Sequence, residues 1–330
     1  MTRHPYLGLA LAAVLAACGG GGGGDDDDDD GDTPGDGVEL PTDPPTATTM
    51  VAAGGFTNPM DAVASPDGAT FYFSAFTDEA SPRPGIFSVP AAGGEVTVLT
   101  SGAPLENPAG LLMSADGSTL FVSDLGVRAG ELGDDAEPSS QSVLYTIGTG
   151  GGALAALPAG GIAEAAGLAL GPDEETLYVS GFTTDNQPAL FTLPTAGGTA
   201  SVVLAGAPLE SPGGVYVDAD SVAWVMDNRP SRALGGALWA IDSQGEATEV
   251  VSGLGLSQPA GVSLVAGGGT AVIPNHTEDG AGQLITVNID SGEQTIVESA
   301  MKDPAGIRTA RGAGVFAVVD SEGGAIYRAE

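Results

Sequence analysis

A repeated unit runs along most of the chain and constrains its fold more than any other feature. The first half of one copy opens at Asn107-Pro108-Ala109-Gly110, turns at Asp116-Gly117 and ends with an apolar run that closes at Asp124. Self-similarity at a fixed period indicates a repeat architecture. The opening segments of the six copies align at one position, which recurs every 45 to 57 residues. The residues at this position are Asp61, Gly110, Gly167, Gly214, Gly261 and Gly306.

Each copy carries four short strand-like runs with turn signals between them. In the third copy these runs are 168–170, 176–180, 189–193 and 201–204. The turns between them contain Gly171-Pro172-Asp173 and Gly197-Gly198, which are residue types that tight turns require. Four-stranded units at this period are typical of propeller blades. The sequence therefore predicts an all-β protein, a six-bladed β-propeller of four-stranded antiparallel blades.

The two ends of the repeat array predict how the ring closes. The sixth copy has only three runs before the chain stops, and so it lacks a fourth strand. A separate strand-like run, 48–52, precedes the first copy and aligns with the fourth run of copy one, 97–101. We expect this N-terminal strand to complete the last blade, which limits the number of exposed strand edges.

The first 17 residues have the pattern of a signal peptide. Arg3 precedes an apolar run, 6–17, which is too short to cross a hydrocarbon core of about 30 Å. The sequence Leu15-Ala16-Ala17-Cys18 resembles the bacterial lipobox, and this implies cleavage before Cys18 and lipidation of its thiol. Gly19, where an aspartate would favour retention at the inner membrane, implies the outer membrane. The alternative is a secretory signal with a chance cysteine.

Residues 18–46 are rich in Gly, Asp, Pro and Thr and contain Gly19–Gly24 followed by Asp25–Asp30. Such a composition cannot bury a core, so we expect a disordered tether that holds the propeller, 47–330, away from the membrane. A second interpretation is an export or Ca²⁺-binding tag. Cys18 is the single cysteine, so the propeller has no internal disulfide.

The chain is strongly acidic, with 43 Asp and Glu against nine Lys and Arg. After residue 46 there remain 33 acidic and eight basic side chains. Such a surface repels nucleic acid and anionic lipid, so we expect neither as a partner, and we expect a monomer. No Walker loop, HExxH, GxSxG or CxxC motif is present.

The expected connections differ between the two faces of the ring. Each blade is antiparallel, so the turns after its first and third strands share one face, here called the turn face. The links after the second and fourth strands share the other, here called the loop face. The links after the second strands are long: 75–84, 124–141, 181–188, 227–236 and 275–282. Because binding residues tend to lie on loops above a rigid scaffold, we place a functional site on the loop face.

Oxygen-bearing side chains and basic side chains are both expected at the loop face. The candidate metal ligands, suited to Ca²⁺, are Asp61, Asp124, Asp227, Asn275 and Asp320. The alternative is that a strand-end Asp caps a turn.

The candidate ligand-binding residues are Arg83, Arg128, Arg229, Arg232 and His276. The alternatives are ion pairs of Arg83 with Asp78 or Glu79, of Arg128 with Glu131 and of Arg229 with Asp227, and a loop histidine without a role.

The repeats resemble six-bladed propellers of the TolB-like, NHL and SMP-30/gluconolactonase group. The resemblance covers 47–330 and rests on the segments 65–74 and 118–124 and on openings such as Pro259-Ala260-Gly261. Gluconolactonase-like members hold a divalent metal in the channel with Glu, Asn and Asp ligands, and the Asp also serves in catalysis. That resemblance makes Asp227 and Asp320 candidate catalytic residues. The first copy offers Asn58 and Asp61 where that family has a Glu.

Taken together, these features lead to two functional expectations. The first is a lipid-anchored protein of the cell envelope, at the outer membrane, whose propeller binds an envelope protein or a glycan without catalysing a reaction. The second is a Ca²⁺-dependent hydrolase of the lactonase type with a metal in the central channel.

Overall fold

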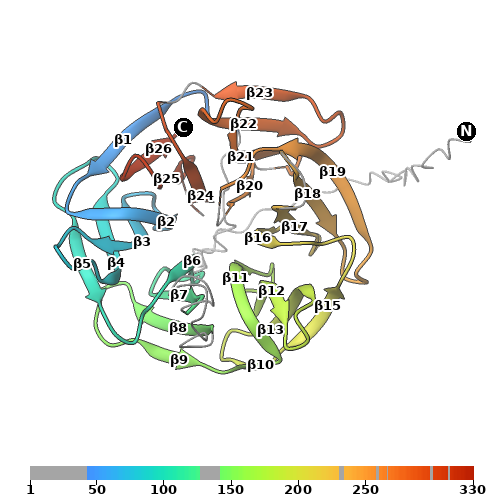
Figure 1. The fold of residues 1–330 in the computed structure, drawn as a ribbon, viewed down its shortest axis with the longest axis horizontal. Coiled ribbons are helices and arrows are strands. Elements are labelled where there is room, and N and C mark those ends of the chain that lie inside the picture. The colour runs from blue at the N-terminus through green and yellow to red at the C-terminus, as the bar shows by residue number, and fades with distance from the viewer. Residues whose placement is uncertain are drawn as a thin grey trace, which may run out of the picture. The chain divides into compact units, whose positions relative to one another are not determined.

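The computed structural model describes residues 43–126, 142–229, 234–257, 260–265, 267–297, 300–310 and 313–330. Six four-stranded antiparallel sheets stand as blades around a ring (Figure 1), as the repeat predicts. No helix of the described residues is long and apolar enough to cross a membrane. Cys18, most of the expected tether and the segment 127–141 lie outside the described residues.

The blades follow one another in chain order. Blade one contains β2 (Phe56–Ala64), β3 (Thr70–Thr77), β4 (Pro84–Pro90) and β5 (Thr97–Ser101). Blade two contains β6 (Pro108–Met113), β7 (Thr119–Asp124), β8 (Val143–Gly148) and β9 (Ala155–Leu157). Blade three contains β11 (Ile162–Leu170), β12 (Thr176–Thr183), β13 (Pro188–Pro194) and β15 (Ser201–Ala205). The short strands β10 (Ala159–Gly160) and β14 (Gly198–Thr199) pair with each other.

The remaining three blades repeat the pattern. Blade four contains β16 (Pro212–Val217), β17 (Ala223–Asp227), β18 (Gly236–Ile241) and β19 (Ala247–Leu254). Blade five contains β20 (Ser263–Leu264), β21 (Thr270–His276), β22 (Gly282–Asn288) and β23 (Gln294–Val297). Blade six contains β24 (Pro304–Thr309), β25 (Phe316–Asp320), β26 (Ala325–Ala329) and, from the other end of the chain, β1 (Thr48–Ala53).

The first strand of each blade is the innermost one, and first strands of neighbouring blades contact each other, as β2 does with β6 and with β24. The ring closes as the sequence predicts, because β1 pairs antiparallel with β26. Thr48 lies opposite Ala329 and Ala53 opposite Ala325. The backbone amide of Thr46 adds a hydrogen bond of 3.0 Å to the carbonyl oxygen of Glu330.

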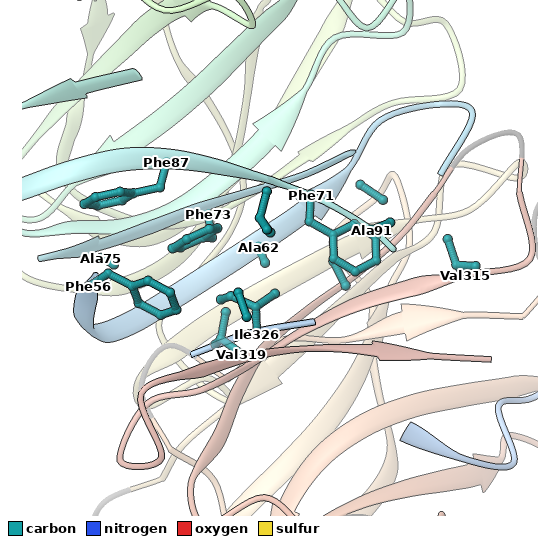
Figure 2. Packing of buried hydrophobic residues seen from close by; sticks show 14 of the residues in the cluster. Phe56, Ala62, Phe71, Phe73, Ala75, Phe87, Ala91, Val315, Val319 and Ile326 are labelled. Atoms are coloured by element: carbon teal, nitrogen blue, oxygen red, sulfur yellow. The ribbon is translucent and has the colours of Figure 1, made fainter. Parts of the chain in front are cut away.

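Apolar side chains fill the spaces between neighbouring blades. Between blades six and one, Phe56 and Phe73 have ring centroids 4.6 Å apart, and Phe73 stacks on Phe87 at 5.4 Å. Figure 2 shows these rings beside Val319 and Ile326 of blade six. These three buried rings, one on each of β2, β3 and β4, help to hold the two blades together, since burying a Phe contributes about 1.5–3 kcal/mol.

Candidate functional site

The acids that end the second strands of blades two and six hold loops in place. Asp124 accepts hydrogen bonds from the backbone amides of Glu106 and Asn107, at 2.8 and 2.9 Å. Asp320 accepts them from the amides of Lys302 and Asp303, both at 2.9 Å. In each blade the two amides belong to the link that enters that blade, so the carboxylate fixes this link against the second strand.

Blades four and five repeat this arrangement. Asp227 accepts the backbone amides of Ser211 at 2.6 Å and of Glu210 at 3.1 Å. Burial raises the pKa of Asp227, while these amide hydrogen bonds act in the opposite direction. The Oδ1 atom of Asn275 accepts the amide of Gly255 at 2.9 Å. In this structure the strand-end residues therefore act as the turn-capping alternative describes, because their side-chain oxygens accept backbone amides of the adjoining links.

The acidic strand-end residues do not form a metal-binding group among the described residues. Among the described residues, no group of three or more His, Cys, Asp or Glu side chains is arranged to hold a metal ion. A Ca²⁺ ion takes six to eight oxygen ligands at about 2.3–2.6 Å, whereas these oxygens belong to separate blades and accept backbone amides. These oxygens are used by backbone amides in this structure, and a metal bound by members of this set stays a prediction.

Asp61 differs from the strand-end candidates because it lies within a first strand, β2, beside the glycines where the first strands of the blades meet. It occupies the position that glycine takes in the other five copies. These glycines permit close approach of the first strands, and a Cβ atom on Gly214 would overlap the carbonyl oxygen of Ala260. The amide of Gly214 donates to that oxygen at 2.7 Å.

A buried arginine, Arg308 of β24, meets Asp61 across this ring of glycines. Its Nη2 atom lies 3.3 Å from Oδ2 of Asp61, and its Nη1 atom donates to the carbonyl oxygen of Val215 in blade four at 2.7 Å. Burial raises the pKa of Asp61, and the charge of Arg308 opposes that shift. The space that these residues share with the glycine ring leaves no room for a water molecule. At this level the axis is closed by the protein itself.

Two of the four candidate arginines lie among the described residues, and both form the ion pairs offered as alternatives. Arg83 is exposed and lies 3.1 Å from Glu79. Arg229 is 5 % exposed, lies 3.6 Å from Asp227 and 2.6 Å from Glu249, and stacks over Trp239. The guanidinium carbon of Arg229 is 4.9 Å from the centroid of that ring. Arg128 and Arg232 lie outside the described residues.

His276 has a partner that sequence reasoning missed. Its Nε2 atom lies 3.0 Å from Oδ1 of Asp303, which precedes blade six. The hydrogen bond with Asp303 raises the pKa of His276 and lowers that of Asp303. The signal available in the sequence was that Asp303 stands immediately before the proline that opens the sixth copy, on the same face as His276.

The turn face carries a hollow that the sequence did not indicate. A groove of about 630 Å³ lies between blades two and three, over the turns that follow β6 and β11. Four of its lining side chains are acidic: Asp116, Asp173, Glu174 and Glu175. Hydrogen bonds from the Ser114 and Ser118 hydroxyls lower the pKa of Asp116 to about 2, so this carboxylate stays ionised at neutral pH.

Known proteins resemble this chain in fold rather than in sequence. No family model matches it, and no curated protein matches its sequence. Solved structures do match its fold. A chain in the crystal structure of a nidogen/laminin complex has 15 % identity and a TM-score of 0.58, with 77 % of this chain and 85 % of that chain covered.

Two bacterial structures show the same likeness. A structural genomics protein of unknown function from Bacteroides thetaiotaomicron has 14 % identity and a TM-score of 0.60, with 88 % of this chain and 74 % of that chain covered. TolB from Acinetobacter baumannii has 13 % identity and a TM-score of 0.55, with 74 % of this chain and 55 % of TolB covered. At these identities the likeness establishes the β-propeller fold, with TolB among the structural neighbours.

Proposed function

We propose that this protein is a lipid-anchored binding module of the cell envelope, whose loop face takes a protein partner. In this proposal Cys18 carries the lipid at the outer membrane, the Gly/Asp-rich segment is a spacer, and the propeller is a rigid platform. We take the partner to be a protein because the candidate residues are spread over several links of one face, and a protein interface of standard size uses roughly 800 Å² from each side.

A binding role is supported by the hydrogen bonds that the strand-end side chains make with the loops. Asp124, Asp227 and Asp320 direct their oxygens to loop amides, so the groups most suited to metal or acid–base chemistry act as loop supports. Loops held by hydrogen bonds to buried carboxylates lose little conformational freedom when a partner binds, and this favours affinity. One structural neighbour is a chain of a nidogen/laminin complex, and this agrees with protein binding by such a fold.

Site-specific photocrosslinking in living cells tests whether the loop face, rather than the turn face, contacts the partner. A photoreactive residue is placed at Ser81 or Asp185, which are exposed in the links after β3 and β12 on the loop face. Matched controls are Ser118 and Gln244, exposed in turns after β6 and β18 on the turn face. We expect crosslinked protein adducts from the loop-face positions only. Adducts from the turn face alone, from both faces equally, or to glycan alone would contradict the proposal.

Labelling with an alkyne fatty acid tests the anchor independently of the partner. We expect the wild-type chain to incorporate the label and to sediment with membranes, because a covalently attached lipid adds about 0.8 kcal/mol of membrane affinity for each buried CH₂. Cys18→Ala should abolish both the incorporation of label and the sedimentation with membranes. The control Ser139→Ala, which also replaces a small side chain by alanine but removes no thiol, should leave both intact. Incorporation of label into Cys18→Ala would remove Cys18 from this role.

The second candidate, a Ca²⁺-dependent lactonase-type hydrolase, is tested by metal analysis and lactone hydrolysis with and without a chelator. Our proposal predicts no turnover that depends on a chelatable metal. Turnover that is abolished by chelator and by Asp320→Asn, with the thermal midpoint retained, would replace the binding proposal with the enzyme.

A further inference from the structure

The strand that closes the ring is also the first strand that a pull on the N-terminal segment reaches. β26 follows the link 321–324 on the loop face, so it runs toward the turn face. β1 is antiparallel to it, with Thr48 opposite Ala329 and Ala53 opposite Ala325. The chain therefore enters β1 at the turn face and leaves it at the loop face.

Backbone hydrogen bonds extend this strand pair beyond its turn-face end. The amides of Thr46 and Ala47 donate to the carbonyl oxygen of Glu330, at 3.0 and 3.3 Å, and the amide of Glu330 donates to the carbonyl oxygen of Ala47 at 3.2 Å. In an antiparallel pair such bonds stand perpendicular to the strands. A pull along β1 therefore loads all of them together, whereas a pull that separates the two strands loads only the bond at the end.

The loop-face end of β1 is held as well. The connection Gly54-Gly55 joins β1 to Phe56, the first residue of β2. Phe56 is 2 % exposed and belongs to the cluster between blades six and one. If β1 slid toward the turn face, it would draw Phe56 out of this cluster. Val51, in the middle of β1, packs against the same cluster, so side chains and main chain resist the same movement.

The strand is nevertheless the place where the ring can be opened from an end. β1 is the outermost strand of blade six and pairs with β26 alone. In blades one to five the outer strand follows the third strand along the chain, whereas β1 and β26 belong to opposite ends of the chain. The direction of the pull on β1 therefore decides how much force the closed ring withstands.

We propose that β1 is a mechanical clamp, which keeps the ring closed when a partner on the loop face pulls against the N-terminal anchor. The inference rests on the proposed function for the source of this force. The two loads then enter at opposite faces, and the force runs along β1, the direction in which its hydrogen bonds are loaded together. When both loads enter at the turn face instead, the pair opens one bond at a time and at lower force.

Optical-trap measurements on the full chain compare the two directions. One DNA handle is attached to the thiol of Cys18, the group at which the proposed lipid would pull, and cell-free synthesis keeps this thiol unmodified. The second handle is attached at the loop face through Glu322→Cys, or at the turn face through Glu330→Cys, and both positions are exposed. The first variant also carries Glu330→Gln and the second Glu322→Gln, so that their charges match. Circular dichroism confirms that each variant is folded.

We expect the first rupture to need a severalfold higher force with the handle at 322 than with the handle at 330. Val51→Ala, which removes packing of β1 against the cluster, should lower the rupture force measured with the handle at 322. Val202→Ala, at a 54 % exposed position of the outer strand β15, should leave that force unchanged. A force at 322 equal to or lower than that at 330, or an equal effect of the two valine changes, would overturn the clamp.

These forces are measured without a lipid or a partner, so they separate the clamp from the proposed function. If crosslinking in cells gives no loop-face adducts while the forces differ as expected, the clamp stands as a property of the fold and the partner is withdrawn. If loop-face adducts form while the two forces are equal, the binding proposal stands and the clamp is withdrawn.

Discussion

At the residue scale, the strand-end carboxylates show how one side-chain type serves the loop face. A link that turns back over its blade presents two backbone amides that no strand satisfies, and a carboxylate can accept both. Asp227 does this while fully buried, and it also lies 3.6 Å from Arg229. A buried amide without an acceptor costs about 1–3 kcal/mol, so these residues are needed for stability whatever the protein binds.

Replacing Asp227 should therefore be costly. We expect Asp227→Ala to lower the free energy of unfolding by about 3–5 kcal/mol, because two amides lose their acceptor and Arg229 loses one of its two carboxylate neighbours. Asp227→Asn should cost less, since it keeps an acceptor oxygen. Urea denaturation measures both, with Asp185→Ala, at an exposed turn position, as the control. An Asp227→Ala variant as stable as the control would contradict the loop-support role.

At the element scale, β1 connects the two ends of the chain. It supplies the fourth strand of blade six, and its pairing register with β26 shifts between Met50, which is 53 % exposed, and Ala52, which is 7 % exposed. Ala52 belongs to the cluster that contains the Phe rings of Figure 2. The strand thus both completes a sheet and covers the apolar space between blades six and one.

A matched pair of substitutions on β1 tests this double role. Ala52→Asp places an unpaired charge in the cluster, and we expect it to cost about 3–5 kcal/mol or to prevent folding. Met50→Asp changes an exposed side chain of the same strand and should alter the free energy of unfolding by about 0.5 kcal/mol or less. Both are measured by thermal and urea denaturation. If the two variants were equally stable, β1 would not be closing the ring in solution.

At the scale of the whole molecule, Arg308 joins three blades through the axis. It belongs to blade six, pairs with Asp61 of blade one and donates to the carbonyl of Val215 in blade four. Its Nε atom has no hydrogen-bond partner among the described residues. Buried ion pairs of this kind often add little net stability and can instead specify one arrangement over others.

A double-mutant cycle separates these contributions. We expect Arg308→Met and Asp61→Asn each to cost about 3–5 kcal/mol, because each leaves an uncompensated buried charge. The double variant should cost less than the sum of the two by about 1 kcal/mol or more, since it leaves no buried charge. Urea denaturation provides all four free energies. Additive costs would show that the two side chains do not act as a pair.

Much of the architecture was predictable because it depends on local patterns. Period-2 runs, turn residues such as Asp116-Gly117 and a fixed spacing each act over a few residues, and they indicate six four-stranded units. The missing last strand and the spare first strand predicted the pairing of β1 with β26 by counting alone. Of the candidate residues, Arg83 lies in its expected link, 75–84, whereas His276, expected in the link 275–282, is the last residue of β21.

The roles of those residues depended on contacts that no local pattern carries. Asp61 stood out in the sequence because its five counterparts are glycines, yet its partner Arg308 lies 247 residues away and could not be inferred from spacing. Likewise, His276 acquires its partner because blade six packs beside blade five, which brings Asp303 at the entrance of blade six against the end of β21. Strands, turns and blade number follow from short-range sterics and burial patterns along the chain. Which charges meet follows from the three-dimensional closure of the ring, which brings together residues that are distant in sequence.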